Sequence, residues 1–282
     1  FEVLVPLRNA TFAFQPDWPA LKNFDIELDF INDGLWMKTD DVALGGVKAS
    51  NLTAIIPDYL KEKLLIDADI NGPGKAVGPY FKETPLKDTL STALDELQLD
   101  GDVSARLHLD IPLDGNMTTA KGDVMLNHND LFIKPINSTV KDLRGKFSFI
   151  NGNLKSEPLQ ATWFNQPLNI DFTTTEGAKA YQVAVNMEGN WQPARTDVLP
   201  SQLGGALSGS LGWKGKVGID LPYGSGARYS VNIDGDLTNI VSKLPPPLDK
   251  TSGKALPVKL KVEGDLRSFE LTGNAGSNNH FN

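Results

Sequence analysis

Hydrophobic and polar residues alternate with a period of two along most of the 282-residue chain. Between Val103 and Leu113, six apolar side chains alternate with polar ones such as Arg106 and His108. Because successive side chains of a strand point to opposite faces of a sheet, this pattern predicts a strand with one apolar and one polar face. The pattern recurs in many short segments separated by turn residues, which predicts an antiparallel, all-β fold.

One segment has a helical period instead. Thr84 is suited to cap a helix and Pro85 to occupy its first position, and apolar side chains then recur every three or four residues until Leu97. Asp100 and the glycine after it interrupt this period. We therefore predict one amphipathic helix near residues 85–99, and only minor helical turns elsewhere.

A weaker copy of this helix-and-strand arrangement follows about 110 residues later, where a short helical pattern over 197–207 precedes another alternating segment. No shift in composition marks a domain boundary. We therefore expect residues 1–282 to form a segment of one continuous β-structure. Its possible repeat units are 1–113 and 114–223, with 224–282 beginning a further unit.

Composition and charge restrict the classes of partner. The net charge is −8 and the sequence pI is about 4.9, which argues against binding nucleic acid or docking electrostatically on an anionic membrane. The chain has no run of 18 apolar residues and no visible signal peptide, and it begins at Phe1 inside an expected strand. We expect it to be a fragment of a longer protein.

Catalytic and metal-binding patterns are missing from the sequence. There is no cysteine, which excludes thiol nucleophiles, disulfides and cysteine metal sites. This fits an envelope protein that avoids unwanted oxidation, but cytosolic proteins can lack cysteine too. The three histidines have no ligand spacing, and His108 is expected to be solvated on the polar face of its strand. Residues 67–72 match the first half of a calcium loop, but Gly78 occupies the position where a bidentate Glu is needed. We predict no catalytic residues, no cofactor and no essential metal.

The apolar faces of the strands have two interpretations. In the first, two sheets close on each other to form an ordinary sandwich core. In the second, one long sheet curls into an open groove whose apolar face suits acyl chains, because its side chains are plain aliphatics and Phe with few polar groups. The candidate lining residues of such a groove are Ile26, Leu28, Phe30, Leu107, Leu109, Ile111, Phe147, Phe149, Ile170, Phe172, Val183, Val185, Met187, Val231, Ile233, Val258, Leu260 and Val262.

Several short motifs resemble those of the AsmA-like family of Gram-negative envelope proteins. They are Pro16-Asp17-Trp18-Pro19, Thr84-Pro85-Leu86, Asp110-Ile111-Pro112-Leu113, and the segment from Leu143 to Phe149 followed by Gly152-Asn153-Leu154. The resemblance covers most of the chain, although the motifs are degenerate.

This resemblance implies a bridge-like lipid transfer fold, in which a long β-groove carries phospholipid across the periplasm between the inner and outer membranes. The implied partners are phospholipid acyl chains and the rest of a longer parent chain, whose inner-membrane anchor lies outside this fragment. Contacts with other envelope proteins are also possible. The family supplies no catalytic residues to assign.

Two other classes of function compete with this one. A structural or adhesive β-solenoid would have a closed core and no lipid cargo. An enzyme or sugar-binding β domain would use tryptophans as platforms, and the chain contains Trp18, Trp36, Trp163, Trp191 and Trp213. These are scattered along the sequence rather than clustered, which makes the third class the weakest of the three.

Overall fold

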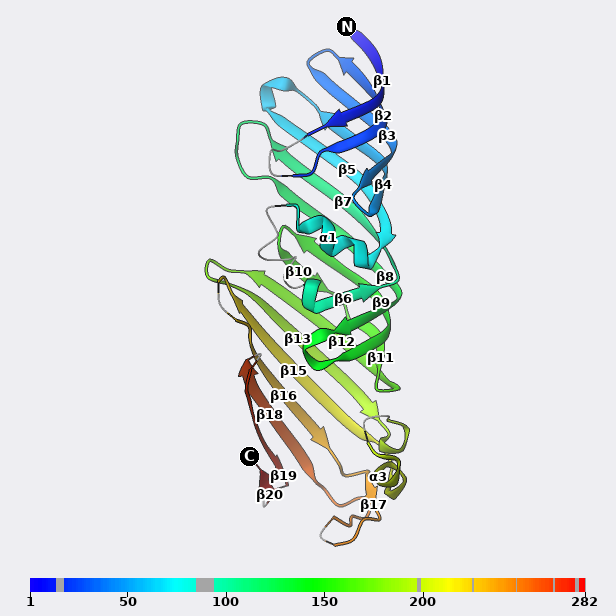
Figure 1. Cartoon of the computed structure of the whole chain (residues 1–282), viewed down its shortest axis with the longest axis vertical. Helices are drawn as coiled ribbons and strands as arrows, with labels where there is room; N and C mark the ends of the chain where they lie inside the picture. Colours follow the sequence, from blue (N-terminus) through cyan, green and yellow to red (C-terminus); the bar gives the residue numbers. More distant parts are fainter. Residues whose placement is uncertain are drawn as a thin grey trace. The chain divides into compact units, whose positions relative to one another are not determined.

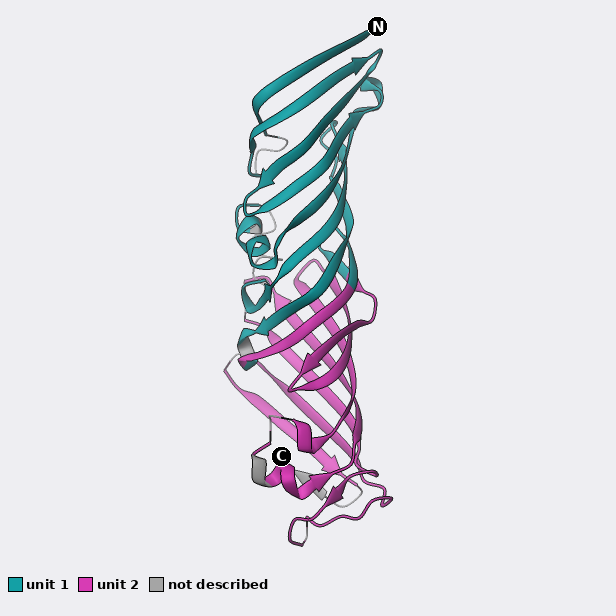
Figure 2. Ribbon diagram, turned by 90° about the vertical axis from the view of Figure 1, so that its right-hand side faces the viewer, with its two compact units in different colours: residues 1–136, 146–154 teal, residues 137–145, 155–282 magenta. Residues whose placement is uncertain are grey.

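The computed structural model describes residues 1–13, 18–84, 94–196, 199–224, 226–246, 248–265, 267–276 and 279–281. Long antiparallel strands dominate it, joined by turns and a few short helices (Figure 1). The expected all-β class and antiparallel pairing are confirmed. The chain divides into two compact units, which are coloured in Figure 2: residues 1–136 with 146–154, and residues 137–145 with 155–282.

Unit 1 contains a curled sheet in which neighbouring strands pair in the order β1, β2, β3, β4, β5, β7, β8, with β6 beside one end of β8. Its strands are β1 (Glu2–Phe12), β2 (Leu21–Ile31), β3 (Gly34–Leu44), β4 (Val47–Ile56), β5 (Lys63–Pro73), β6 (Leu97–Asp100), β7 (Asp102–Pro112) and β8 (Thr119–Ile133). Its short helices are η1 (Tyr59–Lys61), η2 (Gly74–Ala76), α1 (Val77–Phe81) and η3 (Lys134–Ile136).

The unit boundary falls within β9 (Ser138–Ile150) and β10 (Asn153–Ser156). In unit 2, neighbouring strands pair in the order β11, β12, β13, β15, β16, β18, β19, β20. These are β11 (Leu159–Trp163), β12 (Gln166–Glu176), β13 (Ala180–Trp191), β15 (Leu211–Pro222), β16 (Arg228–Asp236), β18 (Pro257–Asp265), β19 (Phe269–Ala275) and β20 (Asn279–Phe281). Short elements complete the unit: η4 (Pro193–Arg195), α3 (Ser201–Ala206), β14 (Leu207–Ser208) and β17 (Val241–Ser242).

Local sequence explains the tight turns. Ile31 of β2 pairs with Gly34 of β3, so Asn32 and Asp33 form a two-residue hairpin loop. Asn32 has a φ of 49°, in the left-handed region that Asn tolerates better than most residues. The short polar turn therefore fixes the register that places the apolar residues of both strands on one face.

The structure describes only the last part of the helix predicted near residues 85–99, because residues 85–93 lie outside the described residues. Leu94 to Glu96 are helical, but Leu97 begins β6 and pairs with Ile133 of β8. The strand replaces the last helical turn because β8 extends beyond its pairing with β7 and offers free backbone groups to this segment.

Asn129 of β8 anchors the bend at Gly101 between β6 and β7. Its side chain has no exposed surface, and its amide nitrogen donates to the carbonyl oxygens of Asp100 and Asp102, each at 3.0 Å. Its side-chain oxygen accepts from the backbone N–H of Asn127 at 2.8 Å. One buried side chain of β8 thus satisfies three backbone groups where β6 and β7 meet end to end beside β8.

We expect Asn129→Ala to lower the free energy of unfolding by about 1–2 kcal/mol, because it removes the side-chain partner of three partly buried backbone groups. The midpoint of urea-induced unfolding measures this loss. Asn127→Ala is the matched control, since the Asn127 side chain is exposed. Equal midpoints for the two variants would contradict the anchoring role of Asn129.

Candidate functional site

In unit 2, the strand registers place apolar side chains in rows on one face of the sheet. Val185 of β13 pairs with Phe172 of β12 and with Val217 of β15, and Val217 pairs in turn with Val231 of β16. Directly paired residues point to the same face, so these residues form one row, which continues to Val262 of β18. The adjacent row consists of Ile170, Met187, Gly215, Ile233 and Leu260. We call these two rows the central rows of unit 2, and the face that carries them its apolar face.

The candidate lining residues of unit 2 all lie on this apolar face. Most of them belong to the central rows. Val183 lies one row further along the strands, paired with Thr174 and Ile219, and Val258 lies one row further in the other direction, paired with Gly235. That these side chains line a lipid path stays a prediction, but the register brings them together on one surface.

The apolar face of unit 2 is open over its central rows and on β19, whereas Leu159 and Leu168 on the same face are buried. The side chains of the central rows are half-buried, whereas the neighbouring residues that point to the opposite face, such as Ala184 and Asn186, are exposed. On β19, Leu271 and Phe269 extend the apolar face and are 38% and 69% exposed. Side chains in the core of a two-sheet sandwich would be buried. The described part of unit 2 therefore carries an apolar surface that no second layer covers.

The corresponding face of unit 1 is packed more tightly. Two clusters of buried side chains lie on it, one of Phe24, Val42, Ala49 and Ala68, the other of Met37, Ala54, Leu64 and Ile111. Alanine recurs in both clusters, and its small side chain lets the larger neighbours meet above the sheet. The apolar face of unit 1 is thus partly filled by its own side chains.

The candidate residues of unit 1 differ in exposure because of these clusters. Ile111 is buried within the second cluster at 5% exposure, whereas Ile26, Leu28 and Leu109 pack against it and remain half-buried. Phe30 and Leu107 are half-buried on the same face, where they pair with Leu35 and Ala68 respectively.

Phe147 and Phe149 extend the apolar face of unit 1 on β9. A Cβ atom on Gly122 would lie 2.8 Å from the ring of Phe149, so the ring covers this glycine. Ser148, between the two phenylalanines, points to the polar face, where its hydroxyl donates to Asp123 at 2.7 Å. At position 122, only glycine leaves room for the ring of Phe149.

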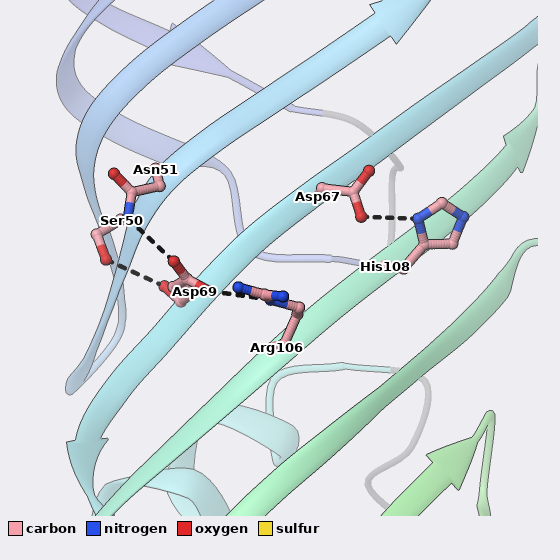
Figure 3. A network of polar contacts seen from close by, with 6 residues as sticks. All are labelled: Ser50, Asn51, Asp67, Asp69, Arg106 and His108. Atoms are coloured by element: carbon pink, nitrogen blue, oxygen red, sulfur yellow. Dashed lines mark hydrogen bonds and ion pairs between the residues drawn. The ribbon is translucent and has the colours of Figure 1, made fainter.

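The opposite face of unit 1 carries polar networks on its central strands (Figure 3). His108 Nδ1 lies 2.9 Å from Asp67 Oδ1, and Asp69 accepts hydrogen bonds from Asn51 at 3.0 Å and from Arg106 at 3.4 Å. These hydrogen bonds hold the pKa of the Asp69 carboxyl below its usual range, and the bond from Asn51 has the largest effect. The carboxylates of the half calcium loop therefore face protein partners on the polar face.

Three of the tryptophans, although far apart in the sequence, form a cluster in unit 2, so the inference that they do not cluster is wrong there. The ring centroids of Trp163 and Trp191 are 6.4 Å apart, and those of Trp191 and Trp213 are 4.7 Å apart in an edge-to-face arrangement. The pairing of Gly189 with Trp213 and of Trp191 with Leu211 brings them together. The proximity of the three rings depends on the strand register, which the sequence does not reveal.

The geometry of this cluster does not suit a sugar platform. Trp213 is only 8% exposed, and the three rings pack against one another instead of presenting flat faces. The indole N–H groups of Trp163 and Trp191 donate to the Ser138 hydroxyl at 2.8 Å and the Pro167 carbonyl at 2.9 Å. Two of the three indole N–H groups therefore donate to acceptors within the protein and are not available to a sugar hydroxyl.

The described residues contain no group of three His, Asp or Glu side chains close enough to hold a metal ion. Among the helices that the structure describes, none is both long and apolar enough to cross a membrane.

Comparisons with known proteins give one family and one relative. The profile of the YhdP protein family matches residues 1–282. A protein of Escherichia coli (strain K12) named "Intermembrane phospholipid transporter YhdP" is 73% identical over 282 residues, which is 100% of this chain and 22% of that protein. The chain thus spans less than a quarter of the length of this relative. No solved structure matches the chain.

Proposed function

This chain belongs to the YhdP family, and we propose that it forms part of a path along which phospholipid acyl chains move between two membranes. The observation that carries the proposal is the open apolar face of unit 2, whose side chains are half-buried in a sheet without a covering layer. The name of the E. coli relative supports phospholipid as the cargo.

An apolar face of this kind lowers the barrier that water imposes on a lipid. Moving a lipid through water exposes its acyl chains at about 0.8 kcal/mol per CH₂ group, or ~10 kcal/mol and more for one chain. Contact with the central rows removes much of that exposure. The side chains of these rows resemble one another, so a chain can slide without meeting a deep local site, and direction must come from another driving force.

The same proposal extends to the place and the partners of the protein. A path between two membranes of a Gram-negative cell crosses the periplasm, so we place these residues there. An inner-membrane anchor would lie outside them. The phospholipid headgroup can stay in water, which requires no headgroup-specific site on the chain. Other envelope proteins would contact the path at its ends.

Site-specific photo-crosslinking in the full-length protein tests this function. We expect a photoreactive residue at Val231 or Leu109, on the apolar faces, to capture phospholipid. At the adjacent positions Asn232 and His108, on the polar faces, we expect no capture, because these side chains point away from the acyl chains. Equal capture at neighbouring positions, or no capture at all, would contradict the proposal.

The competing function is a structural β-solenoid with a closed core. The buried clusters of unit 1 would suit it, but the half-exposed central rows of unit 2 do not. Lipid extracted from the gently purified protein distinguishes the two, because a closed core would retain none.

A further inference from the structure

Aromatic residues other than Phe gather at two margins of the apolar face of unit 2 and are missing from its central rows. The first margin is the cluster of Trp163, Trp191 and Trp213, to which Phe164 adds a ring stacked on Trp163 at 4.5 Å. We call it the Trp margin. Trp213 lies one row beyond Met187 and Gly215, where β15 begins.

The second margin contains three tyrosines and is called the Tyr margin. Tyr181 pairs with Leu221 on β15, and Tyr229 of β16 pairs with Ile219. The Tyr181 hydroxyl bonds to Thr174 Oγ1 at 2.7 Å, and burial raises the pKa of this hydroxyl. Tyr223 follows directly after β15 and is 40% exposed.

The distance between the margins is comparable to a lipid chain. Six residues of β15 separate Trp213 from Ile219, the partner of Tyr229, which corresponds to about 20 Å at about 3.4 Å per residue. In the space between, Gly215 and Val217 of β15 belong to the central rows. The apolar face thus changes from aliphatic at its middle to amphipathic at both margins.

Tryptophan and tyrosine favour boundaries between apolar and polar surroundings, because a large apolar ring carries one polar group. Polar side chains lie directly beside both margins here. Next to the Trp margin, the side chain of Gln166 donates to the backbone carbonyl of Gln192 and accepts from its backbone N–H. At the Tyr margin, the Thr174 hydroxyl accepts from the Tyr181 hydroxyl. A phospholipid changes from apolar to polar in the same order, from its acyl chains through the ester groups to the headgroup.

A purely structural role explains only part of this arrangement. A Cβ atom on Gly189 would lie 2.8 Å from Trp213 Nε1, and one on Gly215 would lie 3.1 Å from the same ring, so Trp213 fills space above two glycines. Trp191 also covers Gly189, since the same Cβ atom would lie 2.7 Å from Trp191 Nε1. Both Trp191 and Tyr229 nevertheless remain half-exposed on the apolar face. Structural filling does not require amphipathic rings at these accessible positions.

We propose that either margin holds the ester and headgroup region of a bound phospholipid while its acyl chains lie over the central rows. This inference rests on the proposed function. Because the N–H groups of Trp163 and Trp191 bond within the protein, contact with the lipid is through the rings and does not select one headgroup. The margins therefore set the orientation of the lipid rather than its identity.

Two photoactivatable phospholipids test this orientation in the full-length protein, one with a diazirine in the headgroup and one with a diazirine at the end of an acyl chain. Adducts are mapped to residues by mass spectrometry. We expect the headgroup probe to label Trp191 and Tyr229, and the chain probe to label Val185 and Val217. Headgroup adducts in the central rows, or the same residues labelled by both probes, would overturn the orientation while leaving the transport function intact.

Variants separate the margins from the fold. Trp191→Leu combined with Tyr229→Leu keeps both positions apolar and should cause the loss of headgroup adducts at the margins, with chain adducts retained and an unchanged circular dichroism spectrum. Trp36→Leu is the matched control, because Trp36 of β3 pairs with Asp29 and lies on the polar face of unit 1. Unchanged headgroup labelling in the double variant would refute the role of the rings.

Absence of any adduct on the apolar face with either probe would overturn the transport function itself, and with it the proposed role of the margins.

Discussion

Val185→Arg is expected to leave unit 2 folded and to abolish lipid transfer. Val185 lies in the middle of a central row, between Phe172 and Val217, and is half-buried. On an open face, the aliphatic part of the arginine side chain can cover the row while the guanidinium reaches water. We therefore expect the free energy of unfolding to fall by no more than about 2 kcal/mol, which is the scale of the lost apolar burial.

The transfer defect has a different cause. An acyl chain that slides along the row would meet a charge that is costly to desolvate, so the path is interrupted at one point. Circular dichroism measures the fold, and phospholipid transfer by the full-length protein measures the path. Ala184→Arg is the matched control, because Ala184 is exposed on the opposite face. An unfolded Val185→Arg variant would indicate a closed core, and a folded variant with normal transfer would remove Val185 from the path.

Ala49→Arg is expected to unfold unit 1, in contrast to the arginine in unit 2. Ala49 has no exposed surface and belongs to the cluster with Phe24, Val42 and Ala68. The larger side chain overpacks this cluster, and its charge has no buried partner. We expect a loss of about 4 kcal/mol or more, a large fraction of the stability of a typical domain.

Thermal unfolding followed by circular dichroism measures this effect. Lys48→Arg is the control at the adjacent position, where the side chain is 60% exposed and pairs with Asp41 at 2.7 Å. A stable Ala49→Arg variant would show that the clusters of unit 1 accommodate a charge as easily as the central rows of unit 2. The apolar face of unit 1 would then not be more tightly packed than that of unit 2.

The sequence by itself determined the two-faced character of the strands, since alternation is a local property of an extended chain. Val183, Val185 and Met187 share one face whatever surrounds them, and the hairpin at Asn32 could be recognised from its turn residues. The polar position of His108 follows from the same rule. The degenerate motifs also sufficed to recognise the family of the chain, which the comparisons confirm.

Only the tertiary structure decided how these faces are covered and which residues meet across strands. Register brought Trp163, Trp191 and Trp213 together, although 50 positions separate the first from the last. It also paired Leu97 with Ile133, which ended the expected helix early. Burial depends on what packs over a face from elsewhere in the chain. The same alternating pattern therefore gives a filled cluster around Ala49 and an open surface around Val185.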